Sequence, residues 1–149
     1  MRTSSNYEFA SDAVVELAGK LIGSYHDHLQ RAKIAYLFKD KASLSKGKVV
    51  VGTASKSSSR DYLLHNFDFV IVLAEDVWSV LNEIQRTKVL DHELCHCIEN
   101  DKGVWSIAPH DFEDFECIVD RYKDVAITLE ASLREFMIER NEKYDENEE

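Results

Sequence analysis

The chain has 149 residues, of which 44% are hydrophobic and 31% are charged, and this suits one compact domain with a hydrophobic core. Its net charge is −10 and its 18 basic residues form no stripe, so binding to nucleic acid is not expected. The three cysteines, Cys95, Cys97 and Cys117, form neither a disulfide framework nor a CxxC pair, which excludes a cysteine-built zinc ribbon. No signal peptide or membrane span is visible, and we expect a cytoplasmic protein.

The chain is expected to begin its ordered part with an amphipathic helix. Hydrophobic residues at three- and four-residue steps predict a helix that starts at Ser11, its N-cap, and ends around Gln30. His26 and His28 lie near its end. Residues two apart point to different faces of a helix, so we interpret both histidines as surface residues rather than as a shared metal site.

Three strands are predicted before the middle of the chain. Segments 33–39 and 48–54 are short and rich in β-branched or aromatic residues, which is typical of strands. Segment 68–74 is an almost continuous apolar run and predicts a central strand that is buried on both faces. The serine-rich stretch 55–61 is interpreted as a connecting loop, and a short helix or turn is expected at 62–65.

Two helices should follow the central strand. Hydrophobic residues recur at helical spacing over 75–84, and a second helix is expected to begin near Thr87 as its cap. A turn at 100–103 would end this helix, because Gly103 can adopt a left-handed backbone conformation. Cys97 falls on the apolar side of the helix and is interpreted as a core residue.

The second of these helices carries the motif His92-Glu93-Leu94-Cys95-His96. Residues four apart lie one turn above each other on an α-helix, so both imidazoles can bind one metal ion. The glutamate beside the first histidine faces the same cleft and can act as a general base toward water. The pattern predicts a zinc site, and a catalytic zinc ion takes a third protein ligand.

His110 is the leading candidate for the third ligand. It follows the motif after residues 97–109 and stands at the start of another predicted helix, which the turn at Gly103 can bring back toward the metal. Glu113 and Asp114 are the alternatives, because carboxylates also bind zinc. If His110 is the ligand, either carboxylate could instead accept a hydrogen bond from a ligand imidazole.

The segment from Asp68 to Tyr122 resembles the small phage-associated metallopeptidases and, more distantly, the SprT-like zincins. The matching features are the strand 68–72, a helix with Trp78, the motif segment 90–97, and His110-Asp111 followed by Phe115. The resemblance implies a zincin-like α+β domain, which we place over residues 1–143, while the acid-rich residues 144–149 are expected to form a disordered tail. In this domain a three- to four-stranded sheet packs on the HExxH helix, with flanking helices.

The same resemblance implies that His92, His96 and His110 bind Zn²⁺ and that Glu93 is the catalytic base. SprT-like proteins usually carry basic or zinc-ribbon DNA-binding parts, which this acidic chain lacks. The resemblance does not specify a substrate.

The leading functional hypothesis is zinc-dependent hydrolysis of a protein or peptide substrate, with no membrane partner. Arg121 and Tyr122 are possible additional donors to the oxyanion, and strand 48–54 is the candidate edge for an extended substrate. The alternative is a non-catalytic zinc-containing binding protein, such as a phage factor that targets a host protein, although such a site has no need of Glu93. A zinc deaminase is disfavoured, since its Pro-Cys-x-x-Cys pattern is absent.

Overall fold

The structure is a computed structural model that describes residues 6–109 and residue 136. Its main element is a four-stranded sheet in the order β1 (Tyr7–Phe9), β2 (Ile34–Lys39), β6 (Phe69–Ala74), β5 (Gly52–Lys56). β2 and β6 are parallel, whereas β1 and β5 run antiparallel to their neighbours. The predicted α+β class, a three- to four-stranded sheet and a central strand within 68–74 are therefore confirmed. The predicted burial of this strand on both faces is not complete, because Val70 and Val72 are only half-buried.

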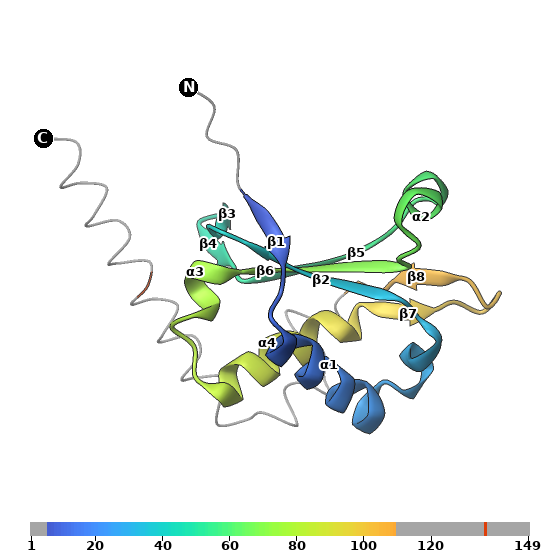
Figure 1. Cartoon of the computed structure of the whole chain (residues 1–149), viewed down its shortest axis with the longest axis horizontal. Helices are drawn as coiled ribbons and strands as arrows, with labels where there is room; N and C mark the ends of the chain where they lie inside the picture. Colours follow the sequence, from blue (N-terminus) through green and yellow to red (C-terminus); the bar gives the residue numbers. More distant parts are fainter. Residues whose placement is uncertain (1–5, 110–135, 137–149) are drawn as a thin grey trace, which may run out of the picture.

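Two helices cover one face of this sheet (Figure 1). α1 (Asp12–Tyr25) and α4 (Glu83–Cys95) contact each other, and α4 also contacts the edge strand β5. A short 3-10 helix, η1 (Asp27–Arg31), follows α1, while α3 (Glu75–Trp78) and α2 (Ser59–His65) flank β6 in the sequence.

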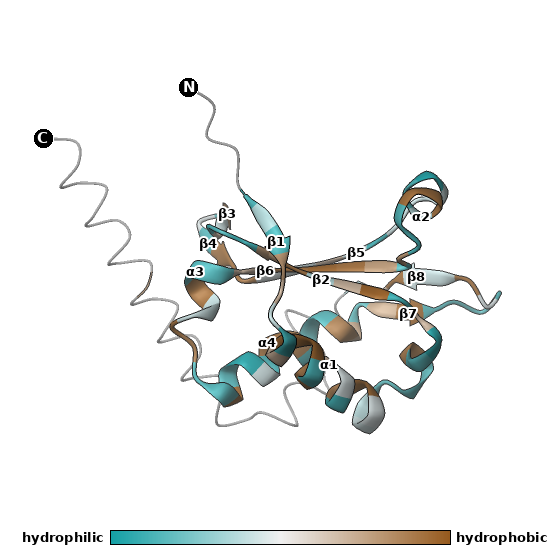
Figure 2. Cartoon of the chain, in the orientation of Figure 1, coloured by the Kyte–Doolittle hydropathy of each residue, from teal (hydrophilic) through white to brown (hydrophobic). Residues whose placement is uncertain are grey.

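The hydrophobic core lies between the sheet and these two helices. Figure 2 shows hydrophobic residues along β6, which lies between two neighbouring strands. Fully buried side chains come from β6 and α4, among them Phe69, Ile71, Leu73, Leu90 and Leu94. Each large apolar side chain that is buried in this way contributes about 1.5–3 kcal/mol to folding. This core holds α4 rigidly against the sheet.

Two hairpins complete the described fold. β3 (Ser43–Ser45) pairs with β4 (Lys48–Val50), and β7 (Cys97–Glu99) pairs with β8 (Trp105–Ile107). The second hairpin follows α4 directly. Gly103 lies in its connection with φ of +74°, so the predicted left-handed conformation is confirmed, although it serves a hairpin and not a helix end.

The prediction of one strand over 48–54 was wrong. The chain divides at Val51: β4 before it pairs with β3, whereas β5 after it pairs with β6. β5 then continues to Lys56 and α2 begins at Ser59, so most of the expected serine-rich loop is regular structure.

The predicted boundaries of the helices also change. α1 has Ser11 at its N-cap as expected but ends at Tyr25, and the helix predicted over 75–84 is confined to α3. α4 begins after Asn82, whose side chain accepts a hydrogen bond from the Gln85 backbone while Gln85 accepts one from the Asn82 backbone. Thr87 is inside the helix, where its hydroxyl donates to the carbonyl of Glu83. A complete capping box thus replaces the single threonine cap that was predicted.

Among residues 6–109 and 136, no helix is long and apolar enough to cross a membrane. The predicted helices and tail after residue 109, and hence the boundary at residue 143, lie outside the described residues.

Candidate metal site

The last turn of α4 brings the three motif side chains together. His92 and Glu93 are helical, and His96 is the C-cap with φ −70° and ψ −25°, so it keeps the helical conformation that the four-residue spacing requires. One ligand atom from each of His92, Glu93 and His96 can be chosen so that all three atoms lie within 4.8 Å of one another. α4 ends at Cys95, before the second motif histidine and well before the turn at 100–103 that was predicted to end it, so the predicted end was wrong. The motif geometry is kept because His96 still has helical dihedral angles.

These side chains line a cleft of about 400 Å³ between α4 and the chain around β5. The opposite wall is formed by residues 49–54, and Lys88 and Val89 extend the α4 wall toward the start of the helix. Glu93 is only 4% exposed, whereas the two histidines are half-buried. The cleft therefore presents two imidazoles and a carboxylate to any molecule that enters it.

The imidazole of His96 is oriented by a residue from beyond β8. Its Nδ1 lies 2.7 Å from the carbonyl oxygen of Ala108, and the Ala108 backbone N–H donates to the carbonyl of His96 at 2.7 Å. A carbonyl only accepts, so Nδ1 carries a hydrogen, and in the neutral imidazole Nε2 is then the nitrogen that can bind a metal ion. Backbone carbonyls commonly impose this orientation on metal-binding histidines by accepting a hydrogen bond from the other ring nitrogen.

The carboxylate of Glu93 is held close to the first residue of β5. A Cβ added at Gly52 would lie 3.2 Å from Glu93 Cγ, Glu93 Oε2 and Leu73 Cδ2. A side chain at position 52 would therefore require the fully buried Leu73 or Glu93 to shift by a few tenths of an ångström, whereas glycine leaves both in place. The role of Gly52 was not predicted, although a glycine inside a strand pattern is a general signal for such a close approach.

Cys97 is fully buried, which confirms the interpretation of this cysteine as a core residue. Burial, together with the nearby charge of Glu93, raises the pKa of the Cys97 thiol to about 12. Its Sγ lies 3.8 Å from the backbone carbonyl of Glu93. The thiol stays protonated at neutral pH and does not compete for a metal ion as a thiolate.

The donor set fits a tetrahedral metal ion such as zinc. Bonds of about 2.0 Å and tetrahedral angles place the ring centroids of two bound imidazoles roughly 5 Å apart. The centroids of His92 and His96 lie 5.2 Å apart with their planes inclined at 72°. Glu93 Oε1 is 3.9 Å from His96 Nε2, so this carboxylate lies beside the pair without a hydrogen bond to that nitrogen.

Several residues named from the sequence lie outside the described part of the chain. These are His110, Glu113, Asp114, Arg121 and Tyr122. Their predicted roles as third ligand, carboxylate partner and oxyanion donors stay predictions.

The sequence of residues 6–137 matches the family described as putative phage metallopeptidase. The chain belongs to this family. The match spans His92, Glu93 and His96 as well as the segment that contains His110, so the family domain includes every residue proposed from the motif. No curated protein and no solved structure shows significant similarity to this chain.

Proposed function

We propose that this protein is a zinc-dependent peptidase in which His92, His96 and His110 hold the metal and Glu93 is the general base. The observation that carries the proposal is the convergence of two imidazoles and a buried carboxylate in one cleft beside an edge strand. Membership in a metallopeptidase family supports the reaction class. A sheet whose antiparallel edge strand contacts the motif helix also agrees with the zincin-like fold that the sequence resemblance implies.

His110 is the third ligand in this proposal because of what precedes it. Ala108 is bonded to His96 through both its backbone N–H and its carbonyl. Two residues of chain span at most about 7 Å, so a ligand at position 110 is within reach of the site on the side where Ala108 lies. Glu113 and Asp114 remain the alternatives.

The chemistry assigns one task to each group of the chain. His92, His96 and His110 would hold a zinc ion, which would supply Lewis-acid chemistry by lowering the pKa of a water molecule toward neutrality and polarising the scissile carbonyl. Glu93 accepts a proton from the water whose oxygen attacks the carbonyl carbon, and then delivers that proton to the amine nitrogen as the C–N bond breaks. The Ala108 carbonyl keeps His96 Nδ1 protonated, so that its Nε2 is the donor atom throughout.

We place the substrate along β5. Within the described residues β5 is the last strand of its sheet, pairing with β6 on one side, and it forms part of the cleft wall. An extended peptide can add its backbone to such an edge and so present one peptide bond to Glu93. This mode needs main-chain contacts and suits a protein or peptide substrate.

Metal removal tests the proposal. We expect purified protein to contain one zinc ion per chain and to cleave members of a broad peptide library, detected by mass spectrometry. A chelator should abolish cleavage and added zinc should restore it, because both the activated water and the polarised carbonyl depend on the ion. One tightly bound ion without cleavage of any peptide would favour the non-catalytic binding protein instead.

Gly52→Ala tests the position of Glu93 in this mechanism. The added methyl group would lie 3.2 Å from Leu73 and from the Glu93 side chain, and because Leu73 is packed in the core, we expect the carboxylate of Glu93 to shift. We expect kcat to fall by about 10- to 100-fold, since small displacements of a catalytic group have effects of this size, while zinc stays bound. Gly19→Ala in α1 is the matched control, because nothing lies within 4 Å of its added Cβ. Unchanged kcat in Gly52→Ala would show that the carboxylate position is not critical.

A further inference from the structure

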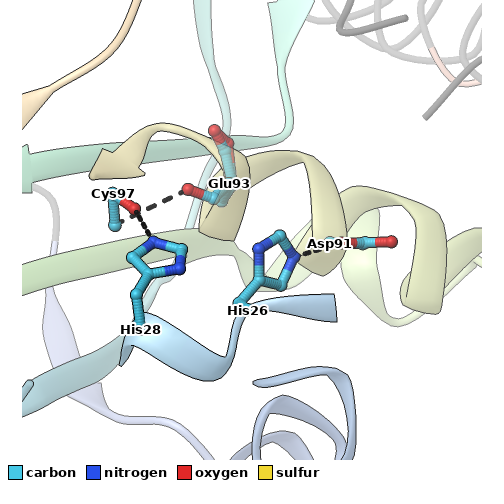
Figure 3. Close-up of polar contacts among 5 residues, drawn as sticks. All are labelled: His26, His28, Asp91, Glu93 and Cys97. Atoms are coloured by element: carbon cyan, nitrogen blue, oxygen red, sulfur yellow. Dashed lines mark hydrogen bonds and ion pairs between the residues drawn. The ribbon is translucent and has the colours of Figure 1, made fainter. Parts of the chain in front are cut away.

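Two histidines outside the motif reach it from the end of α1. His26 is the C-cap residue of α1 and His28 lies in η1; both were interpreted from the sequence as surface residues. That interpretation was wrong. His26 is 5% exposed and His28 is half-buried, and Figure 3 shows both imidazoles directed toward the segment that contains Glu93.

The reason is the end of the regular helix at Tyr25. Beyond it, the two imidazoles lie together, with ring centroids 6.2 Å apart and planes inclined at 70°. The His26 backbone is fixed on both sides, since its N–H donates to Ile22 and its carbonyl accepts from Leu29. Leu29 is 1% exposed and anchors η1 in the core. The pair is therefore part of the packed structure.

His26 binds the residue immediately before the motif. Its Nε2 lies 2.6 Å from Oδ1 of Asp91, and Asp91 is fully buried on α4. A buried carboxylate requires hydrogen-bond donors, and a bond to an ionised group is stronger than a neutral one. This contact joins the end of α1 to α4 at the position that precedes His92.

His28 binds the residue immediately after the motif. Its Nε2 lies 3.0 Å from the carbonyl oxygen of Cys97. The carbonyl of the preceding residue, His96, accepts from Ala108, so the two successive carbonyls are bonded on opposite sides of the chain. His28 thus supplies the donor to the carbonyl of this fully buried residue. Arg31 of η1 also forms a side-chain ion pair with Glu99 of β7, and η1 contacts β7.

We propose that His26 and His28 are positioning residues that hold the metal-binding segment 92–96 from its two ends. The inference rests on the proposed function and deepens it. Asp91 and Cys97 are the residues on either side of the motif, and each is bonded to one of the two histidines. The rotation of the last turn of α4 determines whether His92 and His96 point to one ion. These bonds oppose that rotation at both ends.

A competing role for His26 is as a ligand itself, because His26, Asp91 and Cys95 form a second group of possible ligands. Two ligand atoms on a tetrahedral zinc ion with bonds of about 2.0 Å lie roughly 3.3 Å apart. The 2.6 Å between His26 Nε2 and Asp91 Oδ1 is shorter than that and is a hydrogen-bond distance. The geometry therefore favours a bond between the two residues over a shared ion.

Paired substitutions test the proposal in the full-length protein. His26→Leu and His28→Leu remove the donor, whereas His26→Gln and His28→Gln keep an N–H near the same position. The dissociation constant for zinc is measured by chelator competition, the ligand geometry by the absorption spectrum of the cobalt(II) form, and folding by thermal unfolding of the metal-free protein. His65→Leu is the control, since His65 is exposed on α2 and bonds only locally to the Phe67 backbone in the described contacts.

We expect each leucine variant to bind zinc on the order of 10-fold more weakly and to change the absorption spectrum of the cobalt form. Substitutions of residues that orient metal ligands have effects of this size. The glutamine variants and His65→Leu should resemble the wild type. If His26→Leu does not fold, the comparison of His28→Leu with His28→Gln still tests the proposal, because His28 is only half-buried. Leucine variants that fold and match the wild-type zinc affinity and cobalt spectrum would overturn the proposal.

Two other outcomes separate this inference from the proposed function. A fall from two zinc ions per chain to one in His26→Leu would overturn positioning and make His26 a ligand. A wild-type protein that binds no metal would overturn both proposals. If the leucine variants bind zinc more weakly as expected but the wild type cleaves no peptide, the positioning role is supported and only the proposed peptidase activity is contradicted.

Discussion

Replacing Glu93 by glutamine should lower the kcat of peptide hydrolysis by roughly 10³-fold while the zinc ion stays bound. General-base catalysis contributes about 10²- to 10⁴-fold, and a glutamine amide has nearly the shape of the carboxylate but cannot accept the proton. Glu93 is almost fully buried at the cleft, where no other described carboxylate lines the wall. Its loss should therefore be felt in kcat, which is measured alongside zinc content with the best peptide from the library.

Glu83→Gln is the matched control for this substitution. Glu83 is an exposed residue in the first turn of the same helix, so the change of charge is identical but lies far from the motif. The control should keep the wild-type kcat. If Glu93→Gln cleaves at the wild-type rate, another group activates the water; if it loses the zinc ion, Glu93 is a ligand and the assignment of a base is wrong.

The second large effect is expected for His110→Ala, which should reduce bound zinc from one ion per chain to a small fraction. A catalytic zinc site usually has three protein ligands, and the two histidines left behind hold the ion far more weakly. His96→Ala should give a loss of similar size, since the imidazole of His96 already has the tautomer of a ligand. Zinc content is measured by mass spectrometry after dialysis against a weak chelator.

The alternatives for the third ligand are separated by Glu113→Gln and Asp114→Asn. If His110 is the ligand, these variants should retain the ion and lose at most a modest part of their affinity, as expected for residues that orient a ligand. Full zinc occupancy in His110→Ala, with loss in one of the carboxylate variants, would transfer the role to that carboxylate.

Structural features that depend on residues close together in the sequence could be predicted. The apolar run at 69–74 became the central strand β6, in which Phe69, Ile71 and Leu73 are fully buried while Val70 and Val72 are half-buried. The four-residue spacing of His92 and His96 placed their rings side by side, because helical periodicity is a local property. Even the early end of α4 left this intact, since His96 kept helical dihedral angles.

Structural features that depend on contacts between residues far apart in the sequence could not be predicted. His26 and His28 looked like surface residues because their partners, Asp91 and Cys97, are 65 and 69 positions away in the sequence. From the sequence Gly52 is an ordinary strand residue, and only the fold shows that Glu93 packs closely against it. The division of segment 48–54 followed from the choice of pairing partner on each side of Val51, which no local pattern specifies.

The sequence by itself determined the chemical groups of the site, which are two imidazoles and a carboxylate at helical spacing. The same short motif and the segments around it also indicated the family. The tertiary structure decided which groups surround that motif. It placed β5 opposite the histidines, the Ala108 carbonyl on His96, and the end of α1 against both sides of the motif. The physical reason is that the hydrophobic periodicity of a segment specifies on which face of its helix or strand a side chain lies. The packing of the core determines which other residues contact that face.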